Sequence, residues 1–163
     1  MLLSAGGMTD KQVPFGKSEL LERFDPSLLR DIMGVHGHSG HLKFEYQGHG
    51  DDWVEMAMDW REDLVVDEES GALASAAIFS LMDNATSQAV WTRVGKFRPH
   101  ATMDMRIDYL RPSPPGARVF GRGECYHLTS TVSFVRGIAH NGDPADPVAH
   151  VAGTFICTEG YQK

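Results

Sequence analysis

The chain has 163 residues, which suits a single domain with a hydrophobic core, and its 42% hydrophobic and 23% charged residues are ordinary proportions for a soluble globular protein. A net charge of −7 argues against nucleic acid and anionic membrane surfaces as partners, although a small polyanionic ligand needs only a local cluster of arginines. Two cysteines, Cys125 and Cys157, provide neither a disulfide framework nor a metal-ligand spacing, so we expect free, buried thiols.

The N-terminal part of the chain is interpreted separately from the rest. We expect a leader with short helices over residues 1–39 and one domain over residues 40–163. Apolar residues at helical spacing over 18–35 predict a helix that Asp25-Pro26 divides in two. The first residues lack the pattern of a signal peptide, which predicts a cytoplasmic protein.

Three of the eight histidines lie together in residues 36–41, HGHSGH. A metal site is one interpretation of this cluster. A loop rich in glycine, histidine and serine is the favoured one, because the cluster has neither a paired cysteine nor a helical histidine spacing. We therefore predict no metal ligands.

Two segments alternate between apolar and polar residues, 42–47 and 54–60, and this period of two predicts strands with one buried face. The sequence GHGDD between them predicts a hairpin turn.

A long neutral segment, from Gly71 to Trp91, follows and has the apolar spacing of a helix. Acidic residues at 67–69 precede it, and basic residues follow it, which matches the dipole of a helix. Ser70 is the predicted N-cap, and Gly95 is the predicted glycine at the C-terminal end.

Asp83 is the only charged residue of this neutral segment. Ala76, Phe79 and Val90 flank it on the helix, so we expect the helix to be buried nearly all round. A buried carboxylate is costly unless it is compensated, and such groups gather at functional sites. A solvated or hydrogen-bonded structural acid remains the alternative.

Alternation returns after the helix, from residue 101. One predicted strand face carries Met103, Met105, Ile107 and Tyr109, and the other carries Thr102, Asp104, Arg106 and Asp108. PSPPG at 112–116 ends this strand. Further strands are predicted over 117–127, 130–140 and 148–158, with a turn at 140–147.

The order of these elements predicts an α+β fold in which a curved antiparallel sheet wraps around a long central helix. An open sheet of this kind has an exposed edge strand, and such an edge invites pairing with a second copy. We therefore expect a homodimer or a homotetramer.

Two motifs resemble those of the hotdog fold and, within it, of the acyl-CoA thioesterases related to the phenylacetate-pathway enzyme, the PaaI-like family. GALASAAIFSLMDNA, from residue 71, is similar to the family's loop and helix, where a His-Gly-Gly turn precedes an acid in a Leu-x-Asp pattern. ATMDMRIDYLRPSPPG, from residue 101, is similar to the family's next strand, which ends in Tyr-Leu-Arg-Pro and a glycine turn. The resemblance covers residues 40–158 and implies hydrolysis of an acyl-CoA to free acid and CoA, with no cofactor apart from the CoA of the substrate.

The resemblance also implies roles for single residues. Asp83 would be the nucleophile, or the general base that activates water. The backbone amides of Ser75 and Ala76, at the start of the helix, would stabilise the oxyanion. Thr102 matches a hydroxyl that orients water, and Glu68 matches a polar residue that helps to position it. In the family the site lies between two subunits.

The chain departs from the family pattern at two places. Ala74-Ser75-Ala76 replaces the His-Gly-Gly turn, and Leu128-Thr129-Ser130 replaces a Gly-Arg or Gly-Lys pair that relatives use for CoA phosphates. The phosphates would then be bound by residues in or near this turn and on the strands: Ser130, Arg111, Arg118, Arg122 and Arg136. The alternative for each arginine is a solvated residue on a strand face.

Three functions follow from these observations. The first is an acyl-CoA thioesterase, and the second is a hotdog protein that binds acyl-CoA without hydrolysing it, which the loss of the His-Gly-Gly turn motivates. The third, a hotdog dehydratase, needs a histidine beside the acid. His100 is the nearest one in sequence, and we expect it in the loop before its strand. An acyl pocket or plain core are the alternatives for five further residues: Phe79, Val90, Trp91, Met103 and Met105.

Overall fold

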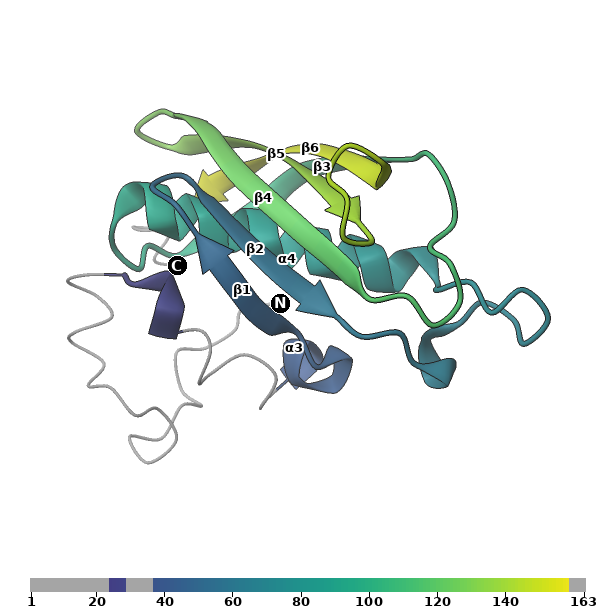
Figure 1. Cartoon of the computed structure of the whole chain (residues 1–163). Helices are drawn as coiled ribbons and strands as arrows, with labels where there is room; N and C mark the ends of the chain where they lie inside the picture. The colour runs from purple at the N-terminus through teal and green to yellow at the C-terminus, as the bar shows by residue number, and fades with distance from the viewer. Residues whose placement is uncertain (1–23, 29–36, 159–163) are drawn as a thin grey trace.

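The computed structural model describes residues 24–28 and 37–158, which form a six-stranded antiparallel sheet curved around one long helix (Figure 1). The long helix is α4 (Ser75–Val94), and the sheet has the order β1-β2-β4-β5-β6-β3. The strands are β1 (Glu45–His49), β2 (Trp53–Met58), β3 (His100–Tyr109), β4 (Val119–Leu128), β5 (Val132–His140) and β6 (Pro147–Cys157). This is the predicted α+β architecture of the hotdog fold, with the predicted order of two strands, a long helix and four strands.

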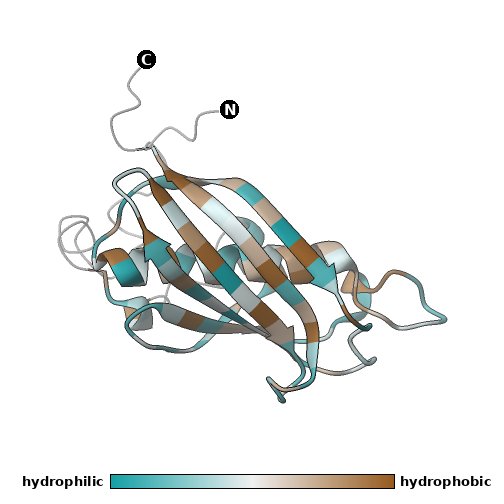
Figure 2. Cartoon of the chain, turned by 90° about the horizontal axis from the view of Figure 1, so that it is seen from above, coloured by the Kyte–Doolittle hydropathy of each residue, from teal (hydrophilic) through white to brown (hydrophobic). Residues whose placement is uncertain are grey.

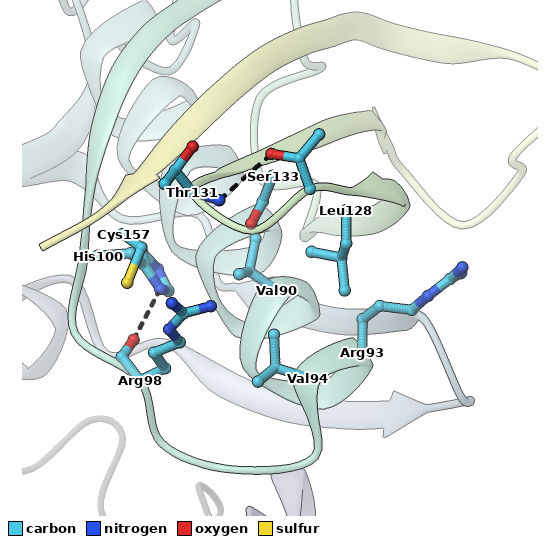
Figure 3. A pocket seen from close by; sticks show the side chains of 10 residues that line it. Val90, Arg93, Val94, Arg98, His100, Leu128, Thr131, Ser133 and Cys157 are labelled. Carbon is cyan, nitrogen blue, oxygen red and sulfur yellow. Dashed lines mark hydrogen bonds between the residues drawn. The ribbon is translucent and has the colours of Figure 1, made fainter. Parts of the chain in front are cut away.

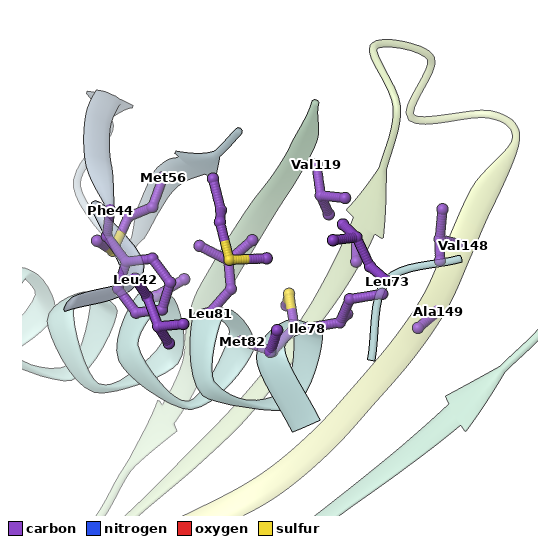
Figure 4. Close-up of a cluster of buried hydrophobic side chains, with 14 of the residues drawn as sticks. Leu42, Phe44, Met56, Leu73, Ile78, Leu81, Met82, Val119, Val148 and Ala149 are labelled. Atoms are coloured by element: carbon purple, nitrogen blue, oxygen red, sulfur yellow. The ribbon is translucent and has the colours of Figure 1, made fainter. Parts of the chain in front are cut away.

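The alternating sequence of the strands separates the two faces of the sheet, and the alternation is visible as brown and teal bands in Figure 2. The face toward α4 carries the fully buried side chains, and Figure 4 shows part of this core between helix and sheet: Phe44, Met56, Leu81, Met82, Val119 and Val148. The core therefore holds α4 against β2, β4 and β5, and only the far side of the helix is left to carry a site.

Helix and sheet approach each other closely at a glycine of β4. A Cβ atom placed on Gly123 would lie 2.6 Å from the backbone of Ala85 and Thr86, a separation that real contacts do not allow. The absence of a side chain at Gly123 therefore sets the distance between α4 and the sheet.

The predicted C-terminal end of the long helix is confirmed, and its predicted N-cap is wrong. Gly95 adopts a left-handed conformation with φ 75°, and its N–H donates to the Trp91 carbonyl. The helix begins only at Ser75, and the side chain of Ser70 bonds with Asp67 in a turn of the preceding loop. This loop folds back on itself, because the Ala74 N–H donates to the Leu64 carbonyl, and so the helix starts later than its neutral composition suggested.

A β-bulge in β3 changes the predicted faces of that strand. Thr102 pairs with Phe155 and Asp104 pairs with Thr154, so Met103 is an extra residue between them. Phe155 is buried against the core, and Thr102 therefore faces α4 instead of sharing a face with Asp104. Met103 is 56% exposed, so its predicted place on the apolar face is wrong.

The histidine-rich segment is not the expected loop, because Gly37–Leu42 forms a short helix, α3. Among the described residues no three His, Cys, Asp or Glu side chains come together as a metal site, and His36 lies outside them. The predicted helices over 18–35 also lie mostly outside the described residues, which include only the short 3-10 helix η1 (Pro26–Leu28) of that segment. Another short 3-10 helix, η2 (Glu62–Leu64), precedes α4.

Candidate active site

The side of α4 that faces away from the sheet carries a short polar strip. Ser80, Asp83 and Ser87 follow one another along this side, and all three are half-buried. The strip lies between α3, whose His38 contacts Ser80 at 3.0 Å, and β3, which contacts the other two residues. The expectation that the helix is buried nearly all round is met only in part in the single chain, because the side toward the sheet is fully buried and this side is half-buried.

Asp83 is held by a hydroxyl from the neighbouring strand. Thr102 donates a hydrogen bond of 2.7 Å from Oγ1 to Oδ1 of Asp83. The β-bulge makes this contact possible, because it turns Thr102 toward the helix. Among the described residues nothing donates to the second carboxylate oxygen, so Oδ2 can accept a proton or a hydrogen bond from a ligand. The fold thus brings together Asp83 and Thr102, two of the residues predicted to be catalytic.

The start of α4 offers free backbone donors. Ala74 precedes the helix with φ −58°, and Ser75 and Ala76 begin it without a positive φ, so replacing the family's glycines has not strained this turn. Within the described part of the chain, no acceptor bonds to the N–H groups of Ser75 and Ala76. The hydroxyl of Tyr109 donates to the Ser75 carbonyl at 2.8 Å, which ties this turn to the end of β3.

An open pocket of about 350 Å³ adjoins the start of the helix. Its lining is mostly apolar and includes Val66, Leu73, Ile78, Tyr109 and Leu110. Val66 and Leu110 are 66% and 56% exposed, an unusual state for large aliphatic side chains gathered in one place. The start of α4 therefore adjoins an open and mostly apolar pocket.

The predicted base and the predicted amide donors are far apart in one chain. Ser75 and Asp83 are separated by eight residues of helix, a rise of about 12 Å. Glu68 lies on the exposed loop before α4 and makes no hydrogen bond to the other predicted catalytic residues that the structure describes. One chain therefore brings Asp83 and Thr102 together, but it places Ser75 and Ala76 about two helical turns away, at the start of α4.

The residues predicted for CoA phosphates are dispersed, and the arginines among them have partners. Arg122 lies over the ring of Trp53 at 3.7 Å, and Arg136 binds Glu124 through two hydrogen bonds of 2.8 and 2.9 Å. Both arginines line a pocket of about 240 Å³ on the sheet face that points away from α4. A phosphate there would meet two cations beside one carboxylate.

The other three residues of this set lie elsewhere. Arg111 bonds to Asp146 and Asn141 and so joins two turns at one end of the sheet, while Arg118 pairs with Glu45. Ser130 lies in the turn between β4 and β5, where its carbonyl accepts a hydrogen bond from the guanidinium of Arg98. Within one chain, none of these three residues adjoins the pair at Asp83.

One contact beside Asp83 was missed in the sequence. His100 is the first residue of β3 rather than part of the preceding loop, and its Nε2 lies 2.8 Å from Oγ of Ser87. Ser87 follows Asp83 by one helical turn. The sequence offered a signal, because His100 precedes Thr102 by two residues of a strand and so shares its face.

The residues proposed for an acyl pocket belong mainly to the core. Val90 is buried in a second core cluster, Met105 packs against both clusters, and Trp91 packs against Phe97 and His100. For these three the structure favours the core interpretation.

Comparisons with known proteins agree with this fold. A family model described as "Thioesterase superfamily" matches residues 71–148. A protein of solved structure from Pseudomonas aeruginosa is 32% identical, with 73% of this chain and 88% of that chain covered and a TM-score of 0.67. The search of curated protein sequences found no match.

Two further solved structures share the fold at lower identity. A thioesterase from Haemophilus influenzae is 17% identical, with 88% of this chain and 99% of that chain covered and a TM-score of 0.73. A mutant of the phenylacetic acid degradation protein PaaI from Thermus thermophilus is 24% identical, with 72% and 96% covered and a TM-score of 0.62.

A curved antiparallel sheet wrapped around a long central helix defines the hotdog fold. With the family match and the 32% identical relative, the chain belongs to the thioesterase superfamily. This membership supports thioester hydrolysis as the general class of its reaction.

Proposed function

We propose that this protein is an acyl-CoA thioesterase that hydrolyses its substrate to a free acid and CoA, with Asp83 as the general base. The observation that carries the proposal is the hydrogen bond from Thr102 to Asp83 on the outward side of α4. It holds one carboxylate oxygen in place, and the other carboxylate oxygen of this half-buried residue has no donor among the described residues, so it is free to accept a proton from water.

The reaction needs one proton acceptor and one oxyanion site. Asp83 takes a proton from water, and the water oxygen forms a bond to the thioester carbonyl carbon. The carbonyl oxygen becomes negative and accepts hydrogen bonds from the free N–H groups of Ser75 and Ala76. The carbon–sulfur bond then breaks, and the proton held by Asp83 goes to the sulfur of CoA.

The rise of about 12 Å between Ser75 and Asp83 prevents one chain from supplying both groups to one carbonyl, because each must lie about 3 Å from the reacting atoms. We therefore propose a homodimer in which the helix start of one copy lies opposite Asp83 of the other. β3 is the edge strand that supports this pairing: it is ten residues long and lies at the end of the sheet, and Met103, Tyr109 and Leu110 are exposed on it or beside it.

The test is a hydrolysis screen over short, long and aryl CoA thioesters, read as release of free CoA thiol. We expect turnover with at least one class of substrate and a fall in kcat of about 10²- to 10⁴-fold for Asp83→Asn. Asp104→Asn is the matched control, because it changes the same carboxylate on an exposed residue that faces away from Thr102. Equal loss in both variants, or turnover unchanged in Asp83→Asn, would contradict the proposal.

Binding of acyl-CoA without hydrolysis is the second candidate, and the replacement of His-Gly-Gly by Ala74-Ser75-Ala76 favours it. It predicts tight calorimetric binding of acyl-CoA by the wild-type chain and no free thiol from any substrate. Binding without turnover across the whole screen would therefore replace the first proposal by this one.

A further inference from the structure

Ser87 and His100 form a hydrogen-bonded pair whose direction is fixed by a third group. His100 Nδ1 lies 3.2 Å from the Arg98 carbonyl. Figure 3 draws this contact at the wall of a third pocket, of about 270 Å³, between the end of α4 and the turn from β4 to β5. A carbonyl oxygen only accepts, so Nδ1 carries the proton and Nε2 of the neutral ring is an acceptor. The Ser87 hydroxyl must then donate its proton to Nε2, at 2.8 Å.

This arrangement departs from the behaviour of the other hydroxyls on α4. Ser80, Thr86 and Thr92 each donate to the carbonyl four residues earlier, the usual bond for such side chains in a helix. Ser87 instead donates across to β3. For Ser87, the His100 ring on the neighbouring strand has therefore replaced the helix carbonyl four residues earlier as the acceptor.

The surroundings of His100 keep its ring neutral and oriented. Burial lowers the pKa of His100 to about 4, so Nε2 stays an acceptor throughout the neutral range. The ring also packs against Trp91 and Phe155, with centroid distances of 4.9 and 5.0 Å. The acceptor is thus held by packing on two sides and by the Arg98 carbonyl on a third.

The pair lies directly beside the proposed base. Asp83–Thr102 and Ser87–His100 are two neighbouring contacts between α4 and β3, one helical turn apart on the helix and two residues apart on the strand. The hydroxyl of Thr102 donates its proton to Asp83, and the hydroxyl of Ser87 donates its proton to His100. Oγ of Ser87 and Oδ2 of Asp83 can therefore both accept a hydrogen bond from a ligand. A water molecule has two donors, and it can therefore bridge two acceptors that lie one helical turn apart on the same side of α4.

We propose that His100 is a positioning residue, which turns the Ser87 hydroxyl so that its oxygen and Oδ2 of Asp83 together hold the attacking water. One O–H of the water donates to Asp83, which takes that proton, and the other O–H donates to Ser87. The water lone pair then points to the thioester carbonyl carbon. This role rests on the proposed hydrolysis.

The variant that tests the role is His100→Phe. Phenylalanine retains an aromatic ring between Trp91 and Phe155 and removes the acceptor, so Ser87 can turn its proton elsewhere. We expect kcat to fall about tenfold while KM changes little, as for the loss of one hydrogen bond in the transition state. His100→Gln restores an acceptor, and we expect part of the lost kcat to return.

Ser87→Ala provides an independent test, because it removes only a half-buried hydroxyl and keeps the fold even where His100→Phe does not. It should lose kcat to the same extent as His100→Phe, and the double variant should lose no more than either. Thr92→Ala and His127→Gln are the matched controls, one for a helix hydroxyl and one for an exposed histidine, and both should turn over as the wild type does.

The outcomes separate this role from the proposed function. If the wild type releases no CoA, the hydrolysis proposal fails, and the role falls with it. If Asp83→Asn abolishes turnover while Ser87→Ala retains wild-type kcat, hydrolysis stands and the role is overturned. An acyl group found on Ser87 by mass spectrometry would also overturn it, because the oxygen would then be a nucleophile rather than an acceptor.

Discussion

At the scale of single residues, the site depends on which atoms are left without a partner. Among the described residues, three groups of the site have no hydrogen-bond partner: the Ser75 amide, the Ala76 amide and Oδ2 of Asp83. The neighbouring hydroxyls of Thr102 and Tyr109 both have one. Arg111 is the opposite case, since each of its three guanidinium nitrogens donates a hydrogen bond, to the Asp146 side chain, to Asn141 and to the Asp146 carbonyl. The free groups are those that hydrolysis needs.

Proline at the first position of a helix removes an N–H group while keeping the helix. Ala74 has φ −58° and ψ 132°, a conformation that a following proline accepts. We therefore expect Ser75→Pro to fold normally and to lower kcat about 10²-fold, because it removes an oxyanion donor. Ser75→Ala keeps the amide and should retain activity. Steady-state kinetics on both variants checks this, and equal activities would exclude the Ser75 amide as a donor.

The buried His100 ring also links folding to pH. Its pKa is about 4 in the folded chain against about 6.5 unfolded, so the unfolded chain binds more protons between these values. Stability is fully present above pH 6.5 and is lost as the pH falls toward 4, by up to about 3 kcal/mol. Urea unfolding at pH 7 and pH 4.5 should show a smaller decrease for His100→Phe than for the wild type. An equal decrease would assign the acid sensitivity to other groups.

The two cysteines differ in burial and therefore in reactivity. Burial raises the pKa of Cys125 to about 11, whereas Cys157 is only half-buried, at the end of β6. The expectation of free thiols is confirmed, and full burial is confirmed only for Cys125. A thiol reagent should therefore modify Cys157 quickly in the native chain and Cys125 only on unfolding. Protection of both, or rapid reaction of both, would contradict these positions.

At the scale of elements, the distance between α4 and β4 is set by Gly123. A methyl group there would meet the helix backbone rather than a flexible side chain, so we expect Gly123→Ala to destabilise the chain by about 2–3 kcal/mol. Gly48→Ala is the matched control, because a Cβ there meets nothing closer than 3.9 Å. The difference between their unfolding midpoints in urea measures the effect. A Gly123→Ala variant as stable as Gly48→Ala would mean that helix and sheet can move apart freely.

The helix and strand patterns could be predicted where local sequence decides them. Period two defined the strands, and the neutral segment with Gly95 defined the long helix and its end. The start of the helix could not be found in this way, because the bonds of Ala74 to Leu64 and of Trp60 to Gly71 hold the loop before it. In the part of the chain that the structure describes, no helix has the length and apolarity to cross a membrane.

At the scale of the whole molecule, hydrolysis by a dimer makes a prediction that a single chain cannot satisfy. Asp83→Asn and Ser75→Pro should each retain about 1% of wild-type activity or less when alone. In a mixed dimer, Asp83 of one copy and the Ser75 amide of the other complete one site, so an equal mixture should recover about a quarter of wild-type activity. Mixing after unfolding and refolding, followed by a hydrolysis assay, tests this. Activity no higher than the sum of the separate variants would place both groups of a site in one chain.

The same dimer can be disturbed at its proposed edge. Leu110→Glu places a charge in the exposed apolar group beside β3, and we expect it to shift the mass measured by light scattering toward the monomer. Tyr126→Glu is the matched control, since Tyr126 is exposed on the outer face of β4, away from that edge. A dimer that persists in Leu110→Glu and dissociates in Tyr126→Glu would move the interface to the outer face of the sheet.

The sequence by itself determined the class of fold, the long helix and the acid on it, because periodicity and a lone charge in a neutral segment are local properties. Tertiary structure alone decided what surrounds that acid. The bulge at Met103 turned Thr102 toward Asp83, and pairing with β6 set His100 opposite Ser87, although the strand pattern had placed Thr102 on the other face. An inserted residue inverts the faces of a strand, and its position depends on the partner strand rather than on the strand's own alternation.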